Sequence, residues 1–234
     1  MIRTTRTTSA APAARILGSL LTVALAACAP ATSVPIANAV APELATPPDS
    51  AALAAADSVL VRFVTTKGDI DVMLRRSWAP LGATRVARLV ASGFYDDARF
   101  FRAVRGFVIQ WGIPADTAAG RAWREKRIAD DTVRESNRRG TVTFAAGGKD
   151  TRTFQLFINL RDNARLDALA FAPVGEVVRG IDAVDSLHTG YGDGPTGPSQ
   201  QRIGAEGEAY LARDFPLLDK VLRARVVRVF AAAR

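Results

Sequence analysis

The sequence is poor in the residues that carry most metal and nucleophilic chemistry. It has one cysteine, Cys28, and one histidine, His188, in 234 residues. Structural zinc sites use clusters of Cys and His, and a cysteine nucleophile needs a base beside it. A Ser-His-Asp hydrolase would have to use His188, but no G-x-S-x-G elbow is present. We therefore expect no zinc site and no hydrolase triad, and we interpret His188 as a helix-end or surface residue.

The sequence also lacks a phosphate-binding loop. A glycine pair, Gly147-Gly148, follows a predicted strand at 141–145, but no Lys-Ser pair and helix come after it. Small residues here would instead let a peptide backbone approach closely. The neighbouring Asp130 and Asp131 could bind a cation, but adjacent carboxylates do not converge without help, so we interpret them as solvated loop charge. We expect no metal and no cofactor.

No apolar run is long enough to span a membrane, but the N-terminus is typical of an export signal. An apolar stretch at 16–27 follows three basic residues, Arg3, Arg6 and Arg15. The end of this stretch, Leu25-Ala26-Ala27-Cys28, is similar to the bacterial lipobox, in which the cysteine is acylated. A buried Cys28 or an ordinary cleaved signal is the alternative. Because two acyl chains anchor a protein stably, we expect a signal peptide at 1–27 and lipidation at Cys28.

The rest of the chain divides into a tether and one domain. Residues 28–57 are rich in Ala and Pro and lack sustained periodicity, which predicts a tether in which a short helix would bury little. The 234-residue chain is 48% hydrophobic and can bury a full core, and we expect that core in one domain at 58–234. The basic stretch 121–127 is interpreted as a solvated loop or short helix, because an exported protein rarely meets nucleic acid. We expect a monomer without a nucleic-acid partner.

The most informative stretch is 100–112, with the sequence FFRAVRGFVIQWG. Two short apolar runs flank Gly106, which is typical of two strands joined by a tight turn. Because successive side chains of a strand face opposite sides, Val108 and Gln110 should share one face, and Phe107, Ile109 and Trp111 the other.

One charged side chain interrupts this pattern. Arg102 shares its face with Phe100 and Val104, and it could be an edge-strand arginine whose head reaches water. A second strand, 153–159, favours a binding site instead. One of its faces is uniformly apolar, while the other combines Gln155 and Asn159 with Phe157, an aromatic residue that has no core reason to be there.

These two stretches resemble the signature of the cyclophilin-type peptidyl-prolyl isomerases. That signature reads F-x-R-x-x-x-G-F-x-x-Q-x-G and later Q-F-F-I, and the second stretch here reads FQLFI. The resemblance covers about 61–187 and the last strand. It implies a mainly β fold, a closed eight-stranded antiparallel β-barrel capped by helices. Segment 188–219, which the common family fold lacks, would be an insert, with a helix at 200–213.

The resemblance also implies roles for individual residues. Arg102 would be the catalytic residue, and the remaining contacts would come from nine others. Phe107, Val108, Phe157 and Leu166 would form a pocket for the proline ring, and Phe171 would be a further substrate contact. Gln110 would hydrogen-bond to the substrate backbone, with Gln155 as a supporting polar contact. Ala145 and Ala146 would contact the substrate through their main chain. Four positions depart from the family: many members carry Met at Val108, Asn at Ala146, Trp at Arg165, and His at Ala170 or Phe171.

Prolyl isomerisation fits a site without a nucleophile or proton carrier. Its barrier, about 18–20 kcal/mol for peptide bonds generally, reflects the loss of amide resonance as the bond twists. The twisted nitrogen regains a lone pair, to which Arg102 could donate a hydrogen bond. Such a bond strengthens only in the transition state, which is how binding becomes catalysis. The hypothesis fails if the guanidinium turns outwards, or if it is locked bidentate to a carboxylate and distant from Phe107 and Gln110.

We therefore expect a prolyl isomerase that acts on proline-containing polypeptides during the folding of exported proteins, where X-Pro steps are slow. The alternative is a catalytically weak module that binds proline segments, or a holdase. A bare structural lipoprotein, without a groove, is a third and weaker idea. Ala29 after the cysteine, rather than Asp, favours the periplasmic side of the outer membrane.

Overall fold

The structure, a computed structural model, describes residues 48–231. The predicted signal peptide, the lipidation site at Cys28 and most of the predicted tether lie outside the described residues. Between residues 48 and 231, no helix is both long and apolar enough to cross a bilayer.

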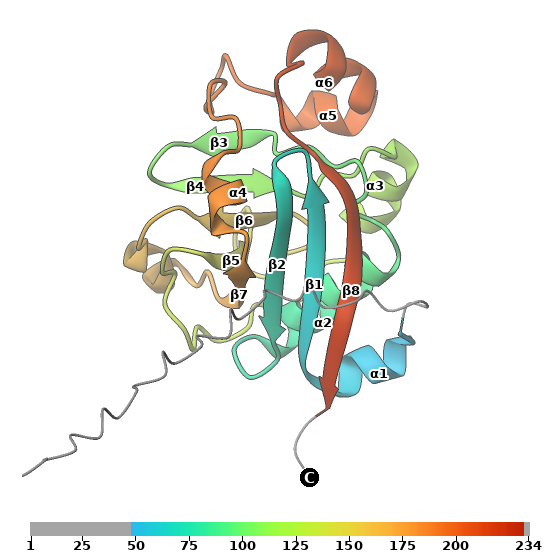
Figure 1. Ribbon diagram of the computed structural model, residues 1–234, viewed down its shortest axis with the longest axis vertical. Helices are drawn as coiled ribbons and strands as arrows, with labels where there is room; N and C mark the ends of the chain where they lie inside the picture. The colour runs from blue at the N-terminus through green and yellow to red at the C-terminus, as the bar shows by residue number, and fades with distance from the viewer. Residues whose placement is uncertain (1–47, 232–234) are drawn as a thin grey trace, which may run out of the picture. The chain divides into compact units, whose positions relative to one another are not determined.

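A single antiparallel sheet of eight strands organises the described part of the chain (Figure 1). Its strands are β1 (Ala56–Thr65), β2 (Gly68–Arg75), β3 (Arg102–Val104), β4 (Val108–Trp111), β5 (Thr141–Phe144), β6 (Leu156–Asn159), β7 (Pro173–Arg179) and β8 (Val221–Ala231). Their spatial order is β3-β4-β6-β5-β7-β2-β1-β8. The mainly β, eight-stranded antiparallel prediction is confirmed.

The predicted closed barrel requires hydrogen bonds between the first and last strands of the sheet, and the described part of the structure does not have this ladder. β3 and β8 stand at the two ends of the sheet, and no ladder joins them among the described residues. The chain just before each of these strands does meet its counterpart, in an isolated bridge between Arg99 and Lys220. Here Phe100 N donates to the Asp219 carbonyl at 3.0 Å, and Val221 N donates to the Ala98 carbonyl at 2.9 Å.

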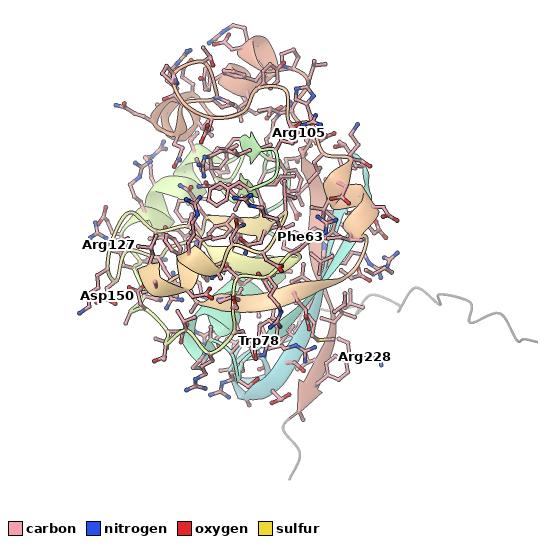
Figure 2. The ribbon with its side chains drawn as sticks, turned by 90° about the vertical axis from the view of Figure 1, so that its left-hand side faces the viewer. Phe63, Trp78, Arg105, Arg127, Asp150 and Arg228 are labelled. Atoms are coloured by element: carbon pink, nitrogen blue, oxygen red, sulfur yellow. The ribbon has the colours of Figure 1, made fainter. Side chains whose placement is uncertain are left out.

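The β1–β2 hairpin illustrates how the pattern of side chains builds the core. Thr65 pairs with Gly68, whose φ of 118° suits the tight turn between the strands. Alternate residues of β1, among them Val61 and Phe63, then face the interior, where both are almost fully buried. Figure 2 shows Phe63 inside the fold and Arg228 on the exposed face of β8.

Helix α2 (Pro80–Ala91) contacts β1, β2, β7 and β8, with Pro80 in its first turn as predicted. The carboxylate of Asp131 accepts hydrogen bonds from Leu81 N at 3.0 Å and Gly82 N at 2.8 Å. It also pairs with Arg152 at 3.1 Å. The interpretation of Asp131 as solvated charge is therefore wrong, because the free N–H groups at the start of a helix recruit a buried acceptor.

The folded part of the chain begins before residue 58, where the tether was predicted to end. Helix α1 (Ser50–Ala55) is capped by Asp49, whose side chain accepts from Ala52 N at 2.7 Å. Leu53 is only 2% exposed, so this short helix does bury an apolar side chain, against α2, β1 and β8. The low complexity of the Ala-rich stretch concealed this single anchoring leucine.

The remaining helices are short connections. Helix α3 (Thr117–Arg124) carries most of the basic stretch predicted as a loop or short helix. The 3-10 helix η1 (Ala164–Leu169) and helix α4 (Ile181–Asp185) flank β7.

Segment 188–219 leads from α4 to β8 and contains α5 (Gln200–Glu206) and α6 (Glu208–Asp214). One helix was predicted over 200–213, but Gly207 breaks it, with a φ of 62° and a ψ of −142°. A Cβ at Gly207 would come within 2.9 Å of the Thr117 side chain, so the close approach to α3 requires glycine. The two ends of the segment meet where His188 N donates to the Asp219 carboxylate at 2.7 Å.

Candidate active site

Three neighbouring strands place the central polar and aromatic residues of the candidate site in one row. Arg102 of β3 lies opposite Gln110 of β4, and Gln110 lies opposite Phe157 of β6. Residues that are directly opposite in an antiparallel ladder share a face of the sheet. The intervening residues, such as Ile109 and Ile158, point into the main core. Strand alternation alone therefore brings Arg102, Gln110 and Phe157 together.

A small apolar cluster, separate from the main core, forms one side of this site. Val108, Phe157 and Leu166 are buried in it, and Phe107, Ala145 and Phe171 pack against it. Strand alternation alone placed Phe107 on the face of Ile109, whereas the family resemblance placed it in the proline pocket, and it does pack against this cluster. It lies in the turn after Gly106 rather than in β4, so the strand period does not apply to it.

Buried polar groups hold η1, and with it Leu166, against the sheet. The Asp167 carboxylate accepts from Ser136 Oγ at 2.6 Å, and from Asn137 N at 2.9 Å and Nδ2 at 2.7 Å. Burial alone would raise the pKa of Asp167, but these hydrogen bonds outweigh it and lower the pKa below its usual value. The amide of Asn137 also donates to the Phe171 carbonyl at 2.7 Å, so one group positions both edges of the apolar cluster.

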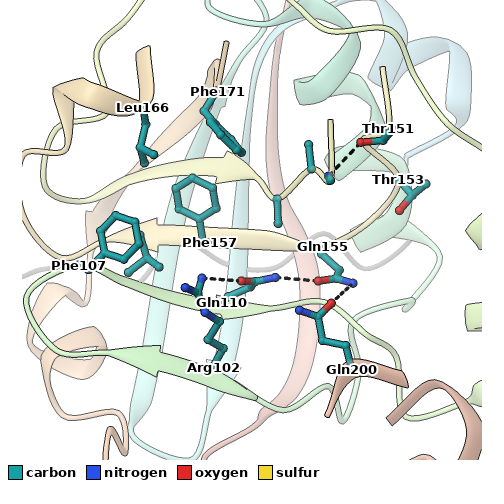
Figure 3. Close-up of a pocket in the computed structure, with 14 residues that line it drawn as sticks. Arg102, Phe107, Gln110, Thr151, Thr153, Gln155, Phe157, Leu166, Phe171 and Gln200 are labelled. Carbon is teal, nitrogen blue, oxygen red and sulfur yellow. Dashed lines mark hydrogen bonds between the residues drawn. The ribbon is translucent and has the colours of Figure 1, made fainter. Parts of the chain in front are cut away.

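The residues predicted for the site line one cavity of about 360 Å³. All ten are present: Arg102, Phe107, Val108, Gln110, Ala145, Ala146, Gln155, Phe157, Leu166 and Phe171. In Figure 3 the rings of Phe107, Phe157 and Phe171 gather on one side, and a line of polar side chains runs along the other. A cavity of this size, with an apolar side and convergent polar groups opposite it, can hold a small ligand or part of a peptide.

The polar side of the cavity is a chain of hydrogen bonds. Arg102 Nη1 donates to Gln110 Oε1 at 3.2 Å, and Gln110 Nε2 donates to Gln155 Oε1 at 2.8 Å. The guanidinium also donates twice to one oxygen of Asp193, from Nε at 3.1 Å and from Nη2 at 2.8 Å. Arg102 is thus held by a carboxylate, and it still points an N–H at Gln110, as the hypothesis requires.

The structure places two of the four positions that depart from the family pattern. The guanidinium carbon of Arg165 lies 4.7 Å from the centre of the Phe107 ring, so the arginine covers this ring at the rim of the cavity. Phe171 lines the cavity and meets the Phe157 ring edge-on at 5.9 Å, whereas Ala170 is exposed and left-handed, with a φ of 63°. Phe171, and not Ala170, therefore occupies the site.

The sequence prediction missed three residues of the cavity, since Thr151, Thr153 and Gln200 also line it. Gly147 lines it too, in line with the expectation that small residues here let a peptide backbone approach. Gly147 N donates to Thr151 Oγ1 at 3.0 Å, which brings Thr151 back to the glycine-rich turn after β5. Gln200 and the Asp193 partner of Arg102 come from segment 188–219, about which strand patterns say nothing.

A protein-family model matches most of the described part of the chain. The family model described as "Cyclophilin type peptidyl-prolyl cis-trans isomerase/CLD" matches residues 60–204, more than half of the chain. The chain belongs to this cyclophilin family. It is 35% identical over 145 residues to peptidyl-prolyl cis-trans isomerase A of Dickeya dadantii, covering 59% of this chain and 75% of that protein. It is 34% identical over 143 residues to the isomerase CYP18-1 of Arabidopsis thaliana, covering 58% and 88%.

Solved cyclophilin structures share the fold at lower identity. A cyclophilin-type isomerase from Cryptosporidium parvum matches with a TM-score of 0.55 and 20% identity, over 72% of this chain and 97% of that one. The cyclophilin AquaCyp293 from Hirschia baltica matches with a TM-score of 0.51 and 20% identity, over 71% and 74%. The cyclophilin fold of this chain thus rests on both sequence and structure.

Proposed function

We propose that this protein is a peptidyl-prolyl cis-trans isomerase. The observation that carries the proposal is the cavity in which Arg102 and Gln110 face an apolar cluster built on Val108, Phe157 and Leu166. The pyrrolidine ring of a substrate fits the apolar side, and its imide bond then lies beside the guanidinium. Family membership and the names of the curated relatives support the same activity.

The chemistry needs only this arrangement. As the X-Pro bond twists, its nitrogen becomes a hydrogen-bond acceptor, and a permanently charged donor then binds the twisted state more strongly than either planar state. The amide of Gln110 has used one oxygen lone pair on Arg102 and one N–H on Gln155, so it retains one of each for the substrate backbone. Ala145 N donates to the Gln155 carbonyl at 2.9 Å, so Ala145 would meet a peptide through its own carbonyl.

The catalytic proposal is tested by a protease-coupled isomer assay on a proline tetrapeptide, with the purified full chain and with Arg102→Ala. We expect the variant to lose roughly 10- to 150-fold in kcat/KM, because a hydrogen bond to a charged group is worth about 1.5–3 kcal/mol. Equal rates for the two proteins, both near the uncatalysed rate, would leave only the alternative function, a module or holdase that binds proline segments.

We further propose that the protein is exported and lipid-anchored through Cys28, and that it acts as a monomer on exported proline-containing polypeptides. The basic, apolar and small-residue pattern of residues 1–28 supports this, and Ala29 favours the outer membrane. Expression of the wild type and of Cys28→Ser in a bacterial host that processes lipoproteins, with labelled palmitate, tests it. Label and membrane association should be found only in the wild type; an unlabelled wild type in the soluble fraction would refute the anchor.

A further inference from the structure

The polar row of the site begins and ends in segment 188–219. Asp193 of that segment accepts from Arg102, and the chain of donors continues through Gln110 and Gln155. Gln155 Nε2 then donates to Gln200 Oε1 at 3.1 Å, and Gln200 is the first residue of α5 (Figure 3). Asp193 and Gln200, only seven positions apart, thus enclose a row formed by Arg102 of β3, Gln110 of β4 and Gln155, the residue before β6.

Hydrogen-bond chemistry gives this row a fixed direction. A guanidinium can only donate, and an ionised carboxylate can only accept. Arg102 therefore forces Gln110 to present its amide oxygen, which turns the Gln110 NH₂ towards Gln155, and Gln155 in turn donates to Gln200. The Gln200 side-chain oxygen accepts the last N–H of the row, from Gln155, and the Asp193 carboxylate binds the guanidinium at the other end.

The contact with Asp193 orients the guanidinium and leaves some of its N–H donors without a partner among the described residues. Asp193 engages Nε and Nη2 along one edge, and Gln110 engages Nη1. One N–H on each of Nη1 and Nη2 remains for a ligand. An arginine side chain has many rotamers in solution, and holding one of them in advance removes an entropic cost from the transition state.

We propose that Asp193 and Gln200 are positioning residues of the isomerase, which makes segment 188–219 part of the active site. This inference rests on the proposed isomerase function. Neither residue needs to touch the reacting imide, because Asp193 acts through Arg102, and Gln200 acts through Gln155 and Gln110. The segment supplies the two acceptors that terminate the row.

The expected effects are modest, because the Arg102–Asp193 pair is partly open to solvent, with 30% and 46% of the two side chains exposed. Exposed ion pairs contribute little, so Asp193→Ala should lower kcat about two- to fivefold. KM and the dissociation constant of a proline tetrapeptide should stay within about twofold, because only a transition-state contact is disturbed. Asp193→Glu should restore most of kcat, because it keeps an anionic acceptor.

The second end of the row is tested by its hydrogen-bond polarity. Gln200→Leu removes the acceptor and should lower kcat, whereas Gln200→Glu keeps the acceptor for Gln155 and should retain it. Asp214→Asn is a matched control, because Asp214 lies in the same segment and pairs with Arg202 and Arg213 away from both Arg102 and Gln155. Thermal unfolding of each variant verifies that the fold is intact.

The outcomes separate this inference from the proposed function. Unchanged kcat in Asp193→Ala and Gln200→Leu would overturn the inference, and so would a higher kcat, which would make Asp193 a lock on Arg102. A rise in KM alone would show direct substrate contact and would also overturn it.

The Arg102 Nε–H signal in ¹⁵N NMR, assigned by its absence in Arg102→Lys, should be sharp in the wild type and broad in Asp193→Ala. If that result is obtained with an inactive wild type, only the proposed catalysis fails.

Discussion

The substitution Arg102→Lys separates charge from geometry at the proposed catalytic residue. In the structure, different nitrogens of the guanidinium reach Gln110 at 3.2 Å and Asp193 at 2.8 Å, and one N–H on each of Nη1 and Nη2 remains for the substrate. A lysine keeps the positive charge but has a single nitrogen on a flexible stem. It can pair with the exposed carboxylate or lie beside Gln110, but it cannot hold both and still donate to a twisting imide in a fixed direction.

The expected loss follows from these contacts. Losing the whole charged hydrogen bond would cost about 1.5–3 kcal/mol of transition-state stabilisation. Lysine should recover the general attraction of a positive charge but lose the alignment, so we expect kcat to fall roughly tenfold, which corresponds to about 1.4 kcal/mol. KM should change little, because the apolar cluster that receives the proline ring is untouched.

The measurement is the protease-coupled isomer assay over a range of tetrapeptide concentrations, with Arg105→Lys as the control. Arg105 lies in the same β3–β4 turn, is exposed and does not line the cavity. It should tolerate the change. A wild-type kcat in Arg102→Lys would refute the reasoning, because it would mean that a point charge suffices and that the arrangement with Asp193 and Gln110 is irrelevant to the rate.

Three further predictions concern the pocket, the charge network and the sheet. Phe157→Ala removes a ring that is 5% exposed, and it should weaken binding of a proline peptide by roughly tenfold or more, measured by calorimetry. Asp71→Ala removes the nearer carboxylate of the buried Arg62, at 2.7 Å, and leaves only Asp69 at 3.6 Å, so it should lower the free energy of unfolding by about 3 kcal/mol in urea titrations. Gly175→Ala would overlap the Met73 carbonyl oxygen on the neighbouring strand and should cost about 1–3 kcal/mol, seen as a lower Tm.

The predictions for Asp71 and Gly175 each have a contrary result or a control. For Asp71, burial raises the pKa, but the hydrogen bonds from Arg62 and Arg179 outweigh it, so the folded pKa lies below the ordinary 3.8. The resulting stabilisation is complete above that pH and is lost as the pH falls through the folded pKa, so wild type and Asp71→Ala should converge in acid. Constant differences down to pH 2 would contradict this. Gly147→Ala, in open space, should leave Tm unchanged.

The parts of the site that lie on strands could be predicted from the sequence, because a period of two assigns each side chain to a face. Val108, Gln110 and Phe157 are examples, and Ile109 and Trp111 share the opposite face, as expected, and lie in the main core. Strand alternation failed where no period applies, although the family resemblance had placed Phe107 in the pocket. Phe107 lies in a turn, so its direction is set by the left-handed Gly106, with a φ of 67°, and not by β4.

Long-range polar contacts were beyond the sequence prediction for a different reason. Asp193 follows a glycine and precedes another, 91 positions from Arg102, and nothing local indicates which cation it meets. Asp131 was interpreted as loop charge, but the N–H groups at the start of α2 lie within hydrogen-bond distance of its carboxylate. In both cases the partner is chosen by tertiary structure. Residue type supplied the capacity to accept a hydrogen bond, and only the fold supplied the donor.

The joined ends of segment 188–219 have a practical consequence. Asp219 takes the His188 amide at 2.7 Å with one carboxylate oxygen and the Thr66 hydroxyl at 2.7 Å with the other. When the two ends of a loop are held together, a change in its length alters the entropic cost of closing it only slightly, because that cost grows with the logarithm of the length. The segment between these ends can therefore change in length or charge without disturbing β8. Such a change would alter the contacts of the segment with the active site while the register of β8 is kept.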